Sequence, residues 1–153
     1  MGGFASLHAM LQTTGLSRLA RRKSFQCLHK YEVKDWTPEE NARTFGACFT
    51  PNGHGHNYEL EAYFEGPLDP VTGMIMNLVD VDRLLAETIA PVNGKHLNYE
   101  VAKFHDQVPT TENLAAYLFE RLKVRLTASG VRDVSVARLR LYESENLWVD
   151  VWP

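Results

Sequence analysis

The stretch HGHNYELEAYFE at residues 54–65 alternates apolar and polar side chains along most of its length. Successive side chains of a β-strand point to opposite faces of its sheet, so this alternation predicts a strand with one covered and one open face. We expect the covered face to hold Tyr58, Leu60, Ala62 and Phe64 and the open face to hold Glu59, Glu61, Tyr63 and Glu65.

The residues on either side of this stretch complete a set of strands and helices. Apolar alternation and turn residues predict further strands over residues 25–33, 134–143 and 147–151. Apolar residues at helical spacing predict helices over residues 77–90 and 110–126. The order is strand, strand, helix, helix, strand, strand. It predicts an α+β fold in which a four-stranded antiparallel sheet carries both helices on one face.

Composition limits the class of protein. The chain has 153 residues, 44% of them hydrophobic and 23% charged, which fits one globular domain. Its net charge of −3 argues against a nucleic-acid-binding surface, and no apolar run approaches the roughly 18 residues of a membrane span. The two cysteines are too few for a disulfide framework.

Charge is distributed unevenly along the chain. Residues 1–31 hold five basic side chains and no acidic one, and we interpret residues 1–24 as a basic N-terminal arm ahead of a domain over residues 25–153. The start of the chain also fits the loose patterns of a mitochondrial transit peptide and of N-myristoylation. We favour a plain arm and a cytoplasmic protein. Residues 35–51 are expected to form a loop with a short helix start at residues 37–40, and residues 91–109 a second loop.

Three histidines form a candidate metal site. His54 and His56 lie two apart on a strand, so both imidazoles can reach one ion, and Gly55 between them allows a close backbone approach. His29 is the natural third donor because it shares the inward face of the preceding strand. Three imidazoles leave zinc one open position, which is typical of a catalytic site, whereas Cys27 or Cys48 as a fourth ligand would make it structural. His8, His96 and His105 lack such a pairing.

Several motifs together resemble one family. CFTPNGHGHNY at residues 48–58 resembles the signature of the 6-pyruvoyl-tetrahydropterin synthase and 6-carboxy-tetrahydropterin synthase family. The agreement extends, in order, to FQCLH at 25–29, TPEEN at 37–41, DPVTGMIMNL at 69–78, PTTEN at 109–113 and Tyr142-Glu143.

The resemblance implies a tunnelling fold, in which sheets from several subunits join into a barrel and two trimers stack into a homohexamer. It implies zinc on the three histidines and a substrate like 7,8-dihydroneopterin triphosphate, bound between subunits. It places Thr110, Thr111 and Glu112 at the substrate and Glu143 on the pterin ring. The residues support this role for Glu143, because it shares an apolar strand face with Leu141 and could pair with the guanidine-like edge of a pterin.

The implied chemistry is a lyase reaction. Zinc would acidify C–H and O–H groups of the substrate side chain, and Cys48, at the family's catalytic position, would remove a proton as a thiolate stabilised by the nearby cation. Loss of triphosphate gives a 6-pyruvoyl product, and loss of acetaldehyde gives a 6-carboxy product.

One family feature is missing. Asn93 and Gly94 occupy the places of the family's Asp-His pair, which assists the cysteine. Either His96 replaces the lost histidine, or the chain performs another cleavage such as retro-aldol release of glycolaldehyde, or it binds zinc and pterin with little catalysis. We favour the lyase.

Overall fold

The computed structural model describes residues 15–153. The patterns suggesting a transit peptide or a myristoylation signal, and most of the predicted arm, therefore lie outside the described residues. The elements in chain order are β1 (Ser17–His29), α1 (Pro38–Phe45), η2 (Gly46–Cys48), β2 (His54–Gly66), α2 (Leu78–Ile89), β3 (Lys95–His96), α3 (Leu97–Glu100), η3 (Ala102–Phe104), α4 (Thr111–Ala128), β4 (Ser135–Ser144) and β5 (Leu147–Val151).

The sheet is mixed and has five strands, in the order β3-β1-β2-β4-β5. The neighbours from β1 to β5 are antiparallel, as predicted, but β3 adds a short parallel pairing at Cys27 and Leu28 of β1. The prediction of a four-stranded, purely antiparallel sheet is therefore wrong only in omitting β3. β3 lies inside the expected loop over residues 91–109, and a two-residue strand carries no alternation that a sequence pattern could reveal.

The first strand begins at Ser17 instead of residue 25, and it ends at His29 instead of continuing to Val33. It pairs without interruption from Ser17 opposite Gly66 to His29 opposite His54. Residues 17–24 of the predicted arm thus belong to the sheet. Most of their side chains are exposed, so hydrophobic alternation could not identify this part of the strand.

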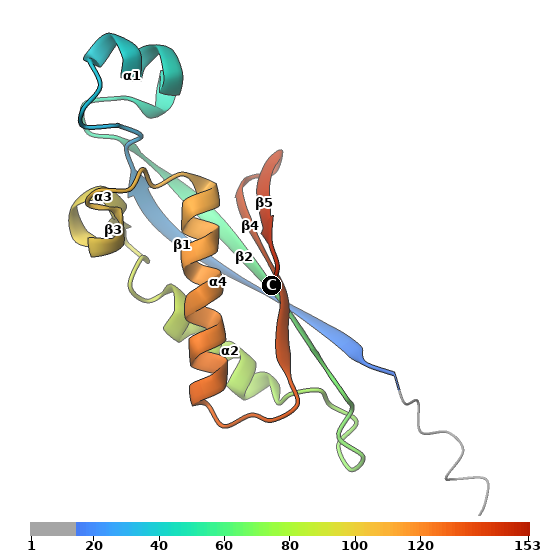
Figure 1. Ribbon diagram of the computed structural model, residues 1–153. Helices are drawn as coiled ribbons and strands as arrows, with labels where there is room; N and C mark the ends of the chain where they lie inside the picture. The colour runs from blue at the N-terminus through green and yellow to red at the C-terminus, as the bar shows by residue number, and fades with distance from the viewer. Residues whose placement is uncertain (1–14) are drawn as a thin grey trace, which may run out of the picture.

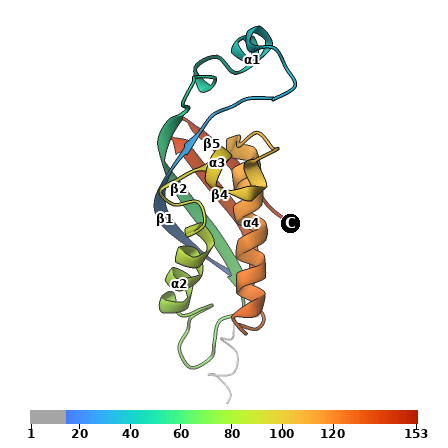
Figure 2. The same ribbon diagram turned by 90° about the vertical axis from the view of Figure 1, so that its left-hand side faces the viewer.

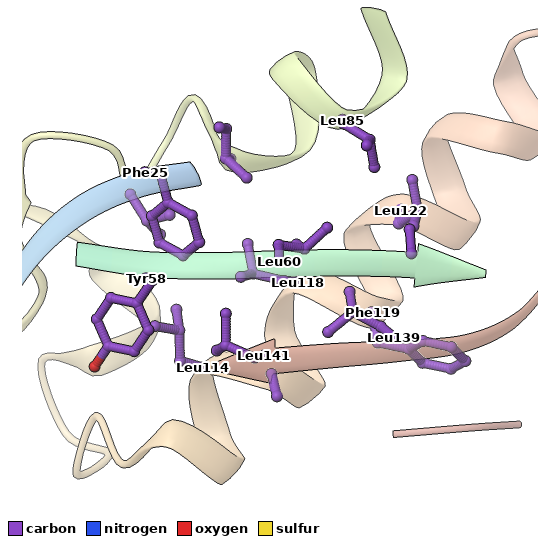
Figure 3. Close-up of a cluster of buried hydrophobic side chains, with 14 of the residues drawn as sticks. Phe25, Tyr58, Leu60, Leu85, Leu114, Leu118, Phe119, Leu122, Leu139 and Leu141 are labelled. Carbon is purple, nitrogen blue, oxygen red and sulfur yellow. The ribbon is translucent and has the colours of Figure 1, made fainter. Parts of the chain in front are cut away.

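Helices α2 and α4 lie side by side on one face of the sheet (Figures 1 and 2). Asn77 caps α2 through the Val79 amide, and Thr110 caps α4 through the Asn113 amide. Their apolar residues meet the covered faces of β1, β2 and β4 to form the core, part of which is shown in Figure 3. The fully buried members include Tyr58, Leu60, Leu85, Leu114, Leu118, Leu122, Leu139 and Leu141.

The opposite face of the sheet is charged. Arg22 of β1 pairs with Glu59 and Glu61 of β2, and Arg140 of β4 makes two 2.7 Å hydrogen bonds with Asp150 of β5. No described helix covers this face in either view (Figures 1 and 2). None of the described helices is both long and apolar enough to cross a bilayer.

Candidate metal and substrate site

The three predicted ligands come together where β1 ends and β2 begins. His29 lies directly opposite His54 in the antiparallel register, and His56 follows on the same strand. Their ligand atoms all lie within 4.8 Å of one another, with His29 Nε2 3.2 Å from His54 Nε2. Gly53 makes this approach possible, because its φ of 70° favours glycine and a side chain there would collide with the carbonyl of His29.

The donor set fits a metal ion. Nε2 of His56 is buried and has no hydrogen-bond partner, which is costly for a polar atom unless another group completes it. Burial, followed by the neighbouring His56, His54 and His96, lowers the pKa of His29 from its ordinary value to about 3. His29 is therefore an unprotonated imidazole at neutral pH, which is the form that binds zinc.

The two cysteines lie outside this cluster of ligand atoms. Cys27 is buried on β1, and burial with the nearby Glu143 raises the pKa of its thiol to about 12. Cys48 is half-buried at the end of η2. The cluster therefore has three histidines and no cysteine, the composition that leaves a fourth coordination position open.

Glu143 faces the histidines. Its Oε1 lies 3.5 Å from Nε2 of His56, its Oε2 accepts a hydrogen bond from the hydroxyl of Thr111, and its side chain is only 9% exposed. This is the face that alternation with Leu141 predicts for Glu143. Tyr142 and Ser144 pair with Trp148 and Leu147 of β5, so a β-bulge also lies at this residue.

Cys48 is attached to the same end of the sheet through its backbone. Its carbonyl accepts a 2.9 Å hydrogen bond from the amide of Tyr31, two residues beyond His29. Burial, and then the negative charge of Glu143, raise the pKa of the Cys48 thiol. The protein groups around Cys48 thus disfavour its thiolate form. The lowered thiol pKa that is expected for a catalytic base has to come from a bound cation.

Asn93 and Gly94, at the places where the resemblance puts an Asp-His pair, both contact the backbone of Gln26. The Oδ1 of Asn93 accepts from the Gln26 amide at 3.1 Å, and the Gly94 amide donates to the Gln26 carbonyl at 2.6 Å. These bonds attach the loop to the outer edge of β1. Neither Asn93 nor Gly94 has an acidic or basic side chain.

His96 lies close to this loop and to the histidine cluster. Its Nε2 is 3.1 Å from the carbonyl oxygen of Asn52, its Nδ1 is buried without a partner, and its positive form would lower the pKa of His29. His105, by contrast, lies in an exposed loop and contacts the Tyr99 carbonyl.

The expected residues at the start of α4 have different surroundings. Thr111 is buried and contacts Glu143, whereas Thr110 uses its hydroxyl to cap the helix and Glu112 is exposed. Sequence reasoning missed Tyr31 and Tyr58. The Thr111 amide donates to Tyr31 Oη at 3.2 Å, and Tyr58 Oη lies 3.0 Å from His29 Nδ1. Each tyrosine follows a ligand histidine by two residues, and that spacing was the available signal.

The fold and the site define an α+β protein with a cluster of three histidines at one end of its sheet, arranged so that they could hold a metal ion. The family model described as 6-pyruvoyl tetrahydropterin synthase matches residues 18–153, so the chain belongs to that family of pterin enzymes. Proteins named 6-pyruvoyl tetrahydrobiopterin synthase from Pongo abelii and Homo sapiens are 40% and 39% identical over 131 residues, which is 85% of this chain and 87% of each relative. The structure of the Caenorhabditis elegans 6-pyruvoyl tetrahydropterin synthase matches with a TM-score of 0.82 and 28% identity, covering 91% of this chain and 96% of that one.

Proposed function

We propose that the chain is a zinc-dependent lyase acting on 7,8-dihydroneopterin triphosphate. One observation carries this proposal: the Glu143 carboxylate lies beside the histidine cluster, with its Oε1 3.5 Å from Nε2 of His56. A metal site next to a shielded carboxylate can bind a dihydropterin whose side chain contacts the metal and whose ring edge contacts the acid. Family membership supplies the class of substrate.

Glu143 is proposed to bind the pterin ring. The guanidine-like edge of a pterin presents two N–H donors, and a carboxylate accepts such a pair as it accepts the fork of an arginine. Thr111 already donates to one oxygen, which fixes the plane of the carboxylate before substrate arrives. Thr110 and Glu112 remain proposed substrate contacts at the same helix start.

Cys48 and His96 are proposed to move protons. A bound zinc ion would polarise oxygen atoms of the substrate side chain and acidify the neighbouring C–H and O–H groups. Cys48 would take a proton as the base, and the unpartnered Nδ1 of His96 makes that residue the candidate to replace the family histidine. The position of His96 near the cluster supports this role because its charge affects His29.

We further propose that copies of the chain assemble into a barrel, as a homohexamer of two trimers. β5 is the last strand of the sheet, and β3 covers only two residues of the outer edge of β1. These edges can pair with strands of other copies, which would also shield them from aggregation. The charged face of the sheet would then line the inside of the barrel, and the site would lie near a subunit boundary.

The decisive experiment is to incubate the zinc-loaded protein with dihydroneopterin triphosphate and identify the pterin products by mass. A 6-pyruvoyl or 6-carboxy product supports the lyase. A 6-hydroxymethyl-dihydropterin product, with the triphosphate leaving on the glycolaldehyde fragment, would support retro-aldol cleavage instead. The uncharged residues Asn93 and Gly94, at the places of the implied relay, favour this candidate. Tight pterin binding without any product would indicate a zinc- and pterin-binding protein.

A further inference from the structure

His29 differs from the other two histidines in having a buried side-chain partner for its second nitrogen. Its Nε2 faces the cluster, 3.2 Å from His54 Nε2, and its Nδ1 lies 3.0 Å from the hydroxyl oxygen of Tyr58. Both His29 and Tyr58 are 0% exposed. The pair is therefore shielded from solvent, and each atom depends on the other for its hydrogen bond.

The direction of this hydrogen bond determines which nitrogen of His29 can hold a metal. A neutral imidazole carries its proton on one nitrogen and a lone pair on the other. If Nδ1–H donates to the oxygen of Tyr58, the lone pair is on Nε2, which points at His54 and His56. With the opposite tautomer, Nε2 carries a proton into the cluster and cannot coordinate.

The tyrosine ring is held independently of its hydroxyl. Tyr58 stacks on Phe25 with ring centroids 5.4 Å apart and an interplanar angle of 13°. Its Cα is paired with that of Phe25 across β1 and β2. The ring therefore presents its oxygen to His29 from a fixed position in the sheet, which is how a partner of a metal ligand sets the orientation of an imidazole.

The hydroxyl oxygen of Tyr58 has lone pairs and can accept the Nδ1 proton of His29. The nearby Thr111 hydroxyl is already committed to Glu143, to which it donates.

We propose that Tyr58 is a positioning residue for the metal, holding His29 in the tautomer whose Nε2 lone pair faces the cluster. The inference rests on the proposed metal site but not on the proposed reaction. It assigns Tyr58 no contact with substrate.

The test compares Tyr58→Phe with Tyr63→Phe in the full chain. Tyr58→Phe removes the hydroxyl and keeps the ring on Phe25, whereas Tyr63→Phe removes a hydroxyl on the same strand that bonds Glu61 on the opposite face. Zinc affinity is measured by competition with a chromogenic chelator, without substrate. Cobalt substitution gives the visible absorption of the bound ion, and thermal unfolding of the metal-free proteins measures the structural effect.

We expect Tyr58→Phe to bind zinc roughly 10–100-fold more weakly, the usual effect of removing such a partner, and to shift the cobalt bands. Tyr63→Phe should match the unchanged protein in zinc affinity and in cobalt absorption. Without metal, His29 of the Tyr58→Phe protein can instead carry its proton on Nε2 and donate it to His54. The substitution should therefore lower the unfolding temperature of the metal-free protein less than that of the zinc-loaded protein. Unchanged zinc affinity and cobalt bands would overturn the proposal, as would equal losses in both variants. A chain that binds zinc in this Tyr58-dependent way but forms no product would contradict the lyase and leave this inference standing.

Discussion

The hydroxyl of Thr111 donates a hydrogen bond to Glu143, and so connects the first residue of α4 to the bulge in β4. The other carboxylate oxygen of Glu143 is left facing Nε2 of His56 at 3.5 Å. The carboxylate of Glu143 is therefore the point at which the start of α4, the bulge in β4 and the strand that holds His56 meet. Small changes at Glu143 should affect ligand binding before they affect the fold.

Replacing Glu143 by Gln should weaken pterin binding. The amide keeps the shape of the side chain but loses the charge that strengthens two hydrogen bonds to the pterin edge, a loss of about 1.5–3 kcal/mol. A fluorescence titration with neopterin should therefore show an affinity roughly 10–100-fold lower. Glu145→Gln, at an exposed position on the β4–β5 turn, is the matched control. Equal affinities for Glu143→Gln and the unchanged protein would exclude Glu143 as the anchor.

Zinc should stabilise the chain through the histidine cluster. A ligand that binds only the folded state adds about 2.7 kcal/mol when present at 100 times its Kd, which corresponds to roughly 5–10 °C in Tm for a domain of this size. We expect calorimetry to show this increase for the unchanged protein and for His105→Ala, whose histidine lies outside the cluster. His56→Ala should lose it. An increase of the same size in His56→Ala would show that zinc binds elsewhere.

The metal-free protein should lose stability as pH falls from about 6.5 toward 3. The pKa of His29 is lowered to about 3 by burial and by neighbouring histidines, and burial also lowers that of His56. In this window the unfolded chain binds more protons than the folded chain, so the free energy of unfolding rises with pH and falls on acidification. His29, which is fully buried, can contribute up to about 1.4 kcal/mol per pH unit.

Urea unfolding of chelator-treated protein at pH 7 and pH 5.5 measures this dependence. The glutamine of the His29→Gln variant cannot be protonated, so its free energy of unfolding should differ less between the two pH values. The His105→Gln variant should keep the full difference. The explanation fails if the His29→Gln protein retains the pH dependence of the unchanged chain.

The sequence predicted the parts of the fold that depend on periodic burial. The alternation over residues 54–65 identified β2, and it also placed His54 and His56 on one side of the strand. The start of β1 was missed because residues 17–24 are mostly exposed, and their place in the sheet is set by pairing with β2. A long-range pairing of this kind leaves no hydrophobic pattern in its own strand.

The candidate site was predictable where residues two apart share a face, and less so where partners come from different elements. His29, His54 and His56 form a cluster as predicted. Alternation with Leu141 also placed Glu143 on the covered face of its strand, where it faces Thr111 and His56. The contact between Tyr58 and His29 depends on the register of two strands, and the contact between Glu143 and Thr111 depends on how α4 packs on the sheet. Local spacing encodes neither relation, so both needed the structure.

Ala20→Pro should block assembly of the barrel without unfolding the subunit. The Gln26 amide points to the outer edge of β1, where it donates to Asn93, and β1 pairs with β2 without a bulge. The Ala20 amide, six residues earlier, therefore points to the same free edge. Proline there removes a donor that only a neighbouring copy would use.

Analytical ultracentrifugation should show a hexamer for the unchanged chain and a smaller species for Ala20→Pro, with circular dichroism unchanged. Ala20→Val, which keeps the amide, serves as the control. A hexamer that survives Ala20→Pro would place the subunit contact away from this edge of β1.

His96→Ala tests whether His96 replaces the missing family histidine. If His96 moves a proton for Cys48, its loss should reduce the turnover of dihydroneopterin triphosphate by about 10²–10⁴-fold with zinc content unchanged, because a general acid or base is typically worth that much.

The double change Asn93→Asp and Gly94→His restores the Asp-His pair that the resemblance implies. It should recover activity in the His96→Ala background, although Gly94 has a φ of 73°, which strains any side chain. A His96→Ala protein with full turnover would show that Cys48, the metal and Glu143 act without a second proton carrier. A further gain when the pair is restored in the unchanged chain would mean that His96 replaces the family histidine only in part.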